Sequence, residues 1–229
     1  MKLYNPFRDL NTFEKALWIT SMCVITLSFL ISGKEGILSL FASLIGVTAL
    51  IFVAKGYVFG QVLTVIFAVF YGIISFAFSY YGEVITYLCM SAPVAVMSII
   101  SWIKHPYKGT KEVEVAKLSG RKIALVSILA VIVTVLFYFI LAYLRNANLI
   151  ISTLSVTTSF IASFLTYLRS PYYAIGYTLN DIVLIVLWIL ASVTDISCLP
   201  MVFCFVMFLF NDLYGFYSWQ KMKKRQQGN

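Results

Sequence analysis

Apolar residues recur along this chain in runs of about twenty, separated by short polar breaks that contain charged residues, proline or glycine. A hydrocarbon core about 30 Å thick is crossed by about 20 residues of α-helix, and a helix satisfies all of its backbone hydrogen bonds within the lipid. The pattern therefore predicts an all-α integral membrane protein. About eight transmembrane helices are expected, at residues 17–31, 36–54, 58–80, 84–103, 123–144, 149–168, 173–193 and 197–219.

The composition indicates that little of the chain lies outside the membrane. Of the 229 residues, 61% are hydrophobic and 11% are charged, whereas soluble domains carry about 25% charged residues. The breaks between the apolar runs are too short for a separate soluble domain. Residues 1–15 carry charges but lack the apolar core and small-residue cleavage site of a signal peptide, so they are expected to be a retained cytoplasmic leader.

Lysine and arginine are distributed very unevenly between the two predicted sides of the membrane. Two of the 17, Lys34 and Arg145, fall on one side, and the other 15 fall on the side of the termini and of the loop 104–122. The positive-inside rule therefore predicts a multi-pass membrane protein with both termini in the cytoplasm. This topology accounts for the net charge of +8, so the lysine-rich tail is expected to contact lipid headgroups and not nucleic acid.

The predicted helices fall into two similar halves. An offset of 117 residues aligns Tyr71 with Trp188 and Trp102 with Trp219, and the order of the spans agrees with it. Because the offset covers four helices, the halves have the same orientation, which predicts two parallel three-helix repeats, a linker helix (3+1+3) and an extra N-terminal helix. Repeats of this kind are typical of transporters that hold substrate between the halves.

The expected segments follow from this plan. They are 1–35 (leader and extra helix), 36–104 (first repeat), 105–148 (basic loop and linker helix), 149–220 (second repeat) and 221–229 (basic tail).

Residues suited to metal binding or to acid–base catalysis are scarce. The four cysteines stand singly in apolar runs, so they are expected to pack as small hydrophobic residues. The one histidine, His105, lies in the basic loop, and the chain has no phosphate-binding loop, serine hydrolase or zinc protease motif. No catalytic, metal or cofactor site is therefore expected. The alternative classes are a membrane enzyme, which needs a convergent acid–base set, and a receptor, which needs more cytoplasmic surface than the basic loop.

Polar and aromatic residues inside the predicted spans indicate a binding pocket. Such residues are costly in lipid and usually serve function or pair with one another, and helical spacing groups them on common faces. Tyrosine and tryptophan faces attract cationic heteroaromatic rings, and asparagine offers both a donor and an acceptor. The candidate substrate contacts are Asn211, Tyr214, Asn180, Tyr177, Tyr173, Trp188, Gln61, Tyr71, Asp181 and Met97.

Some of these residues have a second interpretation. Asn180 and Asn211 could instead link helices by hydrogen bonds. Asp181 and Asp212 could pair with lysines or with tyrosine hydroxyls near the cytoplasmic rim. In helix 197–219, Asp212 points about 100° away from Asn211, so only one of the two can face a pocket squarely.

On these residues the chain resembles the PnuC family of vitamin transporters, over about residues 36–224. The closing "FNDLYGFYSW" (210–219) is similar to the family's N-x-x-Y motif followed by an aromatic-rich turn and a tryptophan. The segment "YYGEVITYLCMSAPVAVMSIISW" (80–102) occupies the corresponding end of the first half. The 3+1+3 plan with an additional N-terminal helix also agrees.

This resemblance implies facilitated diffusion of nicotinamide riboside for NAD synthesis, with no cofactor and with trapping by a cytosolic kinase. It further implies that aromatic residues of the second repeat clamp the ring, that Asn211 and Tyr214 hydrogen bond to the substrate, and that the protein is a homo-oligomer, a trimer. Riboside carriers tend to have tryptophan where this chain has Tyr173 and Tyr177, and often glutamine where it has Ala95. Thiamine, whose thiazolium ring is also cationic, is therefore the alternative substrate, together with other vitamins or nucleosides carried by the family.

Overall fold

The computed structural model describes residues 5–32, 37–77, 84–146 and 148–228, and the described part of the chain is predominantly helical. Its main helices are α1 (Thr12–Ser32), α2 (Ile37–Ala54), α3 (Val58–Ala77), α5 (Ala92–Lys104), α6 (Gly120–Tyr143), α7 (Leu149–Tyr167), α8 (Tyr173–Thr194) and α9 (Leu199–Gln227). Short elements accompany them: η1 (Pro6–Asp9), η2 (Ile85–Ser91, a π-helix continuous with α5), η3 (Tyr107–Gly109) and η4 (Ile196–Cys198).

The predicted all-helical membrane fold is confirmed. Seven helical stretches are long and apolar enough to cross a membrane, and α3 supplies a shorter apolar helix at Val58–Ile73. The predicted end of the third span, at Tyr80, lies outside the described residues. The last helix continues beyond its predicted end at residue 219 to Gln227, because lysine, glutamine, methionine and arginine are good helix formers. Gly228, in the left-handed conformation (φ 80°), then closes it.

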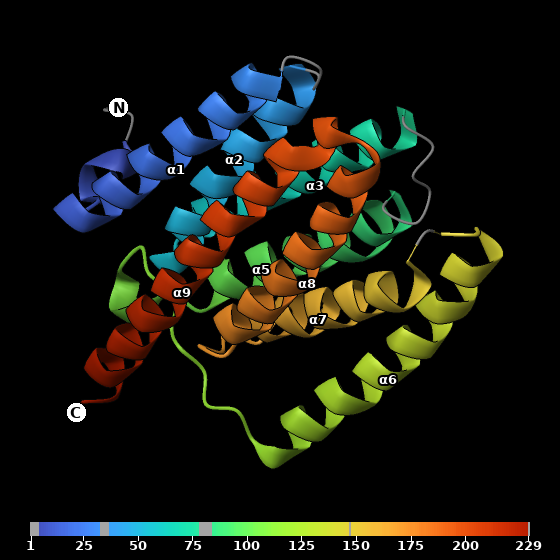
Figure 1. Cartoon of the computed structure of the whole chain (residues 1–229). Helices are drawn as coiled ribbons and strands as arrows, with labels where there is room; N and C mark the ends of the chain where they lie inside the picture. Colours follow the sequence, from blue (N-terminus) through green and yellow to red (C-terminus); the bar gives the residue numbers. More distant parts are fainter. Residues whose placement is uncertain (1–4, 33–36, 78–83, 147, 229) are drawn as a thin grey trace.

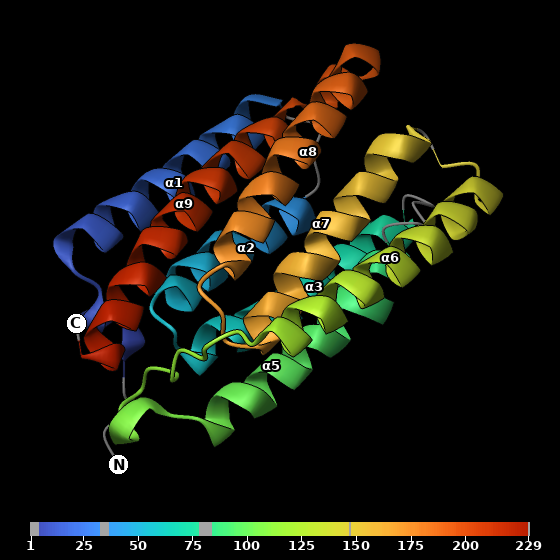
Figure 2. The same cartoon turned by 90° about the horizontal axis from the view of Figure 1, so that it is seen from below.

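The helices form a closed ring with two helices outside it. Neighbours around the ring follow the order α2, α3, α5, α7, α8, α9, and α9 returns to α2. Helix α1 packs on the outside against α2 and α9, and α6 packs mainly against α7 (Figures 1 and 2). The two predicted halves thus meet twice, through α2 with α9 and through α5 with α7. The internal repeat and the segment boundaries drawn from it stay predictions.

The first and last described residues lie at the same end of the ring, which we call the basic end (Figures 1 and 2). Here α1, α3, α6 and α8 begin and α2, α5, α7 and α9 end. Among the described lysines and arginines only Arg145, between α6 and α7, lies at the opposite end; Lys2 and Lys34 lie outside the described residues. The predicted separation of charge is therefore present, and the orientation in the membrane stays a prediction.

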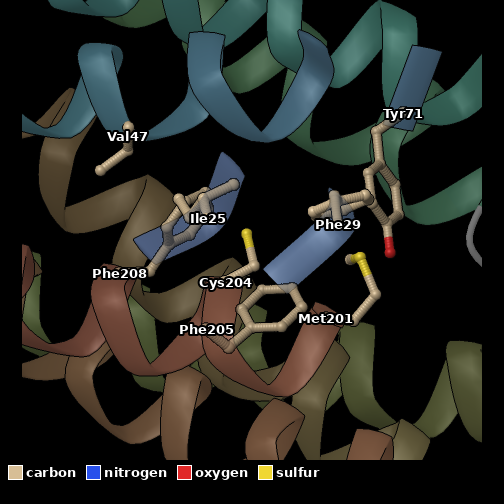
Figure 3. Packing of buried hydrophobic residues seen from close by; sticks show 8 residues of the cluster. All are labelled: Ile25, Phe29, Val47, Tyr71, Met201, Cys204, Phe205 and Phe208. Atoms are coloured by element: carbon tan, nitrogen blue, oxygen red, sulfur yellow. The ribbon is translucent and has the colours of Figure 1, made fainter. Parts of the chain in front are cut away.

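Apolar side chains hold α1 on the ring. Ile25 and Phe29 of α1 pack against Val47 of α2 and against Cys204 and Phe205 of α9 (Figure 3). Cys204 thus packs in the core, as all four cysteines were expected to do.

That expectation fails for two of the others. Cys23 and Cys89 are exposed, because no other helix of the described residues covers the helix face on which each lies.

Helices α2 and α3 approach closely at a glycine. A Cβ atom on Gly60 of α3 would lie 2.5 Å from the backbone nitrogen of Val53 and 2.8 Å from the carbonyl carbon of Phe52, both in α2. Small residues at helix contacts allow backbones to pack closely in membranes, where apolar burial between helices gives little driving force. The glycine is therefore needed for the contact between α2 and α3.

We expect Gly60→Ala to destabilise the fold by about 1–3 kcal/mol, because the atoms that the new methyl group meets are backbone atoms that cannot turn aside. Thermal unfolding in detergent measures the effect. Gly120→Ala is the matched control, since a Cβ atom there meets nothing within 4 Å. Equal unfolding midpoints for the two variants would contradict the close contact.

Candidate functional site

A cavity of about 540 Å³ lies toward the end of the ring opposite to the basic end. Helix α3 and the π-helix η2 form one wall, and α7 and α8 form the other. The turn between α6 and α7 and the short helix η4 lie at its mouth. Ligand pockets usually have volumes of about 300–1,000 Å³ and combine apolar walls with a few polar groups, so this cavity suits a small ring-containing molecule.

Aromatic rings line both walls. Tyr71 of α3 and Tyr87 of η2 lie with ring centroids 4.5 Å apart, and Trp188 of α8 lines the other wall. The π-helix positions Tyr87, and its wide turn ends with a hydrogen bond from the Ala92 nitrogen to the Tyr87 carbonyl. Pro93 follows, and a proline in a helix lacks an N–H group and crowds the preceding turn, which the wider π turn accommodates.

Asn180 of α8 lies at the deep end of the cavity and is held by hydroxyl groups of α7. The Thr158 hydroxyl donates to Asn180 Oδ1 at 2.9 Å, and the Ser155 hydroxyl donates to the same oxygen at 3.3 Å. Asn180 is buried, with 7% of its surface exposed. Among the described residues no group accepts a hydrogen bond from its amide nitrogen, which is therefore available to a ligand.

A buried pair of carboxyl groups lies beside Asn180, at about the same depth in the ring. Asp181 of α8 and Asp212 of α9 lie close enough to interact electrostatically, and each is only 3% exposed. Neither forms an ion pair with a lysine or arginine among the described residues, so the lysine pairing considered as one alternative is not seen there. Beside the pair, the hydroxyls of Tyr177 and Ser163 lie 2.9 Å apart.

Two tryptophans close the basic end. The rings of Trp102 (α5) and Trp219 (α9) have centroids 5.5 Å apart, and the ring of Tyr173 lies 5.0 Å from that of Trp219. All three side chains are almost completely buried. The Trp219 indole donates to the Val53 carbonyl of α2 at 2.8 Å, and the Trp102 indole donates to the Thr166 carbonyl of α7 at 3.1 Å. We call Trp102 and Trp219 the tryptophan pair.

The two accepting carbonyls have equivalent places at the helix ends. Val53 lies three residues before Gly56 (φ 69°), which ends α2, and Thr166 lies three residues before Arg169 (φ 56°), which ends α7. In each case the left-handed residue also donates its backbone N–H to the same carbonyl, at 2.9 Å. Each tryptophan therefore binds the helix end of the opposite half in the same way.

The ten predicted site residues divide into groups. Tyr71, Asn180 and Trp188 line the cavity. Tyr173 and Tyr177 lie nearer the basic end, and Asp181 is buried beside Asn180 without lining the cavity. The two remaining predictions outside α9 do not reach the cavity: Gln61 is buried within the ring, and Met97 is 41% exposed on the outer side of α5.

Asn211 and Tyr214 of α9 face α1 and not the cavity. The Asn211 amide donates to the Ser21 hydroxyl at 3.0 Å. The Tyr214 hydroxyl donates to Glu14 Oε1 at 2.8 Å, and Lys55 Nζ lies 3.0 Å from Glu14 Oε2. In this state both side chains hold α1 on α9, as the interhelical interpretation of Asn211 anticipated. Their direct contact with substrate stays a prediction.

Several residues that line the cavity were not predicted from the sequence. Ser152, Ser155 and Ser159 line the cavity from α7, and their spacing of three and four residues places them on one helix face, a signal that was present in the sequence. Tyr87 had no such signal, because the π-helix changes the angle between successive side chains.

A second hollow, of about 930 Å³, lies outside the ring between α1 and α9 at the basic end. Tyr214, Glu14, Lys55 and Lys221 contribute to its lining. Unlike the first cavity, it does not lie between the two halves of the ring, so the cavity at Asn180 is the better candidate for a transport site.

Comparisons with known proteins agree with this geometry. The family model of the Nicotinamide mononucleotide transporter matches residues 36–221. The chain belongs to this family. The nicotinamide riboside transporter PnuC of Neisseria mucosa is 28% identical over 222 residues, which cover 95% of this chain and 84% of that protein. The crystal structure of the vitamin B3 transporter PnuC superposes with a TM-score of 0.81 at 26% identity, covering 95% of this chain and 94% of that one.

The predicted resemblance to the PnuC family, which was assigned to about residues 36–224, is thus confirmed for residues 36–221. The matched relatives of this family are named as transporters and not as enzymes.

Phenylalanine substitutions in the tryptophan pair test how much the two indole hydrogen bonds at the basic end contribute to stability. Trp102→Phe and Trp219→Phe each remove one buried indole-to-carbonyl hydrogen bond, so each is expected to destabilise the protein by about 1–3 kcal/mol in denaturant unfolding. Trp18→Phe is the control. The half-buried Trp18 indole donates to the Thr48 hydroxyl of α2, and this hydroxyl also bonds to the Leu44 carbonyl. A smaller loss of stability is therefore expected for Trp18→Phe. A larger loss for Trp18→Phe than for the pair would contradict this assignment.

Proposed function

We propose that the protein carries nicotinamide riboside across the bacterial inner membrane by facilitated diffusion. The observation that carries the proposal is the cavity at Asn180, in a member of this transporter family, open toward one end and closed by the tryptophan pair at the other. The named relatives support the choice of substrate. A site reached from one end and closed at the other is what alternating access requires.

The lining of the cavity fits a cationic nucleoside. The pyridinium ring of nicotinamide riboside would lie against Tyr71, Tyr87 or Trp188, whose ring faces attract positive charge. The Asn180 amide would pair with the carboxamide or with a ribose hydroxyl, while Ser155 and Thr158 hold it in place.

The direction of the cavity fits uptake. If the basic end faces the cytoplasm, as the positive-inside rule predicts, both termini are cytoplasmic and the cavity opens outward. Substrate released inside would be phosphorylated by a cytosolic kinase and thereby trapped for NAD synthesis. Assembly as a homotrimer is expected from the family resemblance and stays a prediction.

Thiamine is the second candidate. Tyrosines at 173 and 177, in place of the tryptophans of riboside carriers, change the aromatic set near the cavity. The carboxyl pair close to Asn180 would also favour a thiazolium cation. Both candidates are cationic rings, so a direct comparison of binding is needed.

Ligand-induced thermal stabilisation distinguishes a substrate site at Asn180, in the cavity, from one at Asn211, on the face of α9 that contacts α1. We expect nicotinamide riboside to raise the unfolding midpoint of the purified protein, because a ligand that binds the folded state stabilises it. Asn180→Leu is expected to weaken binding about tenfold or more through the lost hydrogen bonds, with the protein still folded. Asn211→Leu is the matched variant: it should lower the midpoint without ligand, through loss of the Ser21 contact, and retain the ligand shift.

The opposite result would reassign the site. Loss of the ligand shift in Asn211→Leu together with its retention in Asn180→Leu would place the substrate at Asn211, as the N-x-x-Y motif suggested.

Uptake into liposomes tests the transport mode. Purified protein should pass labelled nicotinamide riboside down its gradient without ATP and without an imposed ion gradient, at a rate well above that of protein-free liposomes. The same vesicles should exclude labelled thiamine. Passage of thiamine and not of the riboside would overturn the substrate assignment, and a requirement for an ion gradient would overturn facilitated diffusion.

A further inference from the structure

A short non-helical segment, residues 110–118, crosses the basic end directly beside the tryptophan pair. We call it the strap. Its sequence "TKEVEVAKL" alternates charged and apolar residues, and the valines point inward: Val113 is 1% exposed and Val115 is 6% exposed. Both pack in the cluster that contains the tryptophan pair and Tyr173. The strap is therefore part of the closure of the basic end.

The backbone of the strap binds both halves of the ring. Val113 N donates to the Gly56 carbonyl at 2.9 Å, and Ala116 N donates to the Arg169 carbonyl at 3.0 Å. Gly56 and Arg169 are the left-handed residues that end α2 and α7, so the strap joins equivalent points of the two halves. The ends of α2 and α7 cannot separate at the basic end unless at least one of these bonds breaks.

One side chain of α9 fastens the middle of the strap. Gln226 Oε1 accepts from Val115 N at 2.8 Å, and Gln226 Nε2 donates to the Val113 carbonyl at 3.0 Å. A single amide group thus pairs with the strap as a neighbouring β-strand would. Next to it, Arg225 forms an ion pair with Glu112.

We propose that the strap is the gate at the basic end, that Gln226 is its latch, and that the strap leaves the tryptophan pair when substrate passes to that side. This inference rests on the proposed transport function. The strap is not helical and therefore has no helical hydrogen bonds of its own, so we expect it to open at a lower free-energy cost than the helix ends. Its two lysines and two glutamates are suited to contact with water once the strap has moved away.

Release of the strap can be measured without any substrate. In a background with Cys23, Cys89 and Cys198 replaced by serine and Cys204 by alanine, Val115→Cys places a thiol on the buried face of the strap. Its rate of labelling by a maleimide then reports how often the strap opens. Adding Gln226→Leu should raise this rate about tenfold or more, because two hydrogen bonds to the strap are lost.

The neighbouring residue provides the control. Gln227 is exposed, and Gln227→Leu makes the same chemical change one position away, so it should leave the labelling rate unchanged. The thermal midpoints of both variants show whether the fold is kept. Equal labelling rates for the two leucine variants would overturn the latch.

A cross-link tests whether the strap must open for transport. Glu112→Cys with Arg225→Cys, in the same background, replaces the exposed ion pair with two thiols that a short bifunctional thiosulfonate reagent can join. The cross-link should reduce uptake of nicotinamide riboside to the level of protein-free liposomes, and reductant should restore it. Each single-cysteine variant, treated with the same reagent, should keep its uptake.

Ligand binding distinguishes the gate from the transport function itself. Because the cavity opens at the other end, the cross-linked protein should keep its thermal stabilisation by nicotinamide riboside. Full uptake through the cross-linked protein would overturn the gate and leave the transport function intact. Absence of stabilisation in the protein before cross-linking would instead overturn the proposed substrate.

Discussion

The reciprocal hydrogen bonds of the tryptophan pair fix how the two halves of the ring meet. A helix leaves its last carbonyls without partners, and near lipid such groups need protein partners. The indoles of Trp219 and Trp102 supply them, at the ends of α2 and α7, and each bond crosses from one half to the other. The same rings fill the space between the helix ends, so one contact provides both the hydrogen bonding and the closure of the basic end.

The rest of the polar architecture is arranged relative to this closure. Beyond the tryptophan pair lie Asn180 and the carboxyl pair at about the same depth, followed by the open part of the cavity. On the outside of the ring, the buried ion pair between Glu14 and Lys55 joins α1 to the end of α2. Removing one partner of such an ion pair is costly, whereas the intact pair mainly fixes the arrangement of its helices.

The sequence predicted the parts of the structure that depend on local pattern. Run length located the helices, and the 117-residue offset paired Trp102 with Trp219, which are in contact, and Tyr71 with Trp188, which both line the cavity. The π-helix and the strap were not predicted. A π turn alters side-chain directions without a distinctive composition, and the strap's alternating pattern acquires its inward face only from the helix ends that it crosses.

The opposite assignment of faces on α9 shows why helical spacing alone does not locate a site. Helical spacing predicted that Asn211 and Tyr214 share one face of α9 and that Asp212 points in another direction, and both relations hold. The face with Asn211 and Tyr214 contacts α1, whereas Asp212 lies next to Asp181 of α8. A helical pattern fixes the angles between side chains, but it does not determine which neighbouring helix each face meets.

Met97 of α5, which the 117-residue offset aligns with Tyr214 of α9, is exposed and apolar. A polar residue is tolerated on the outer face of α9 because α1 supplies partners, and the outer face of α5 at Met97 has no covering helix among the described residues.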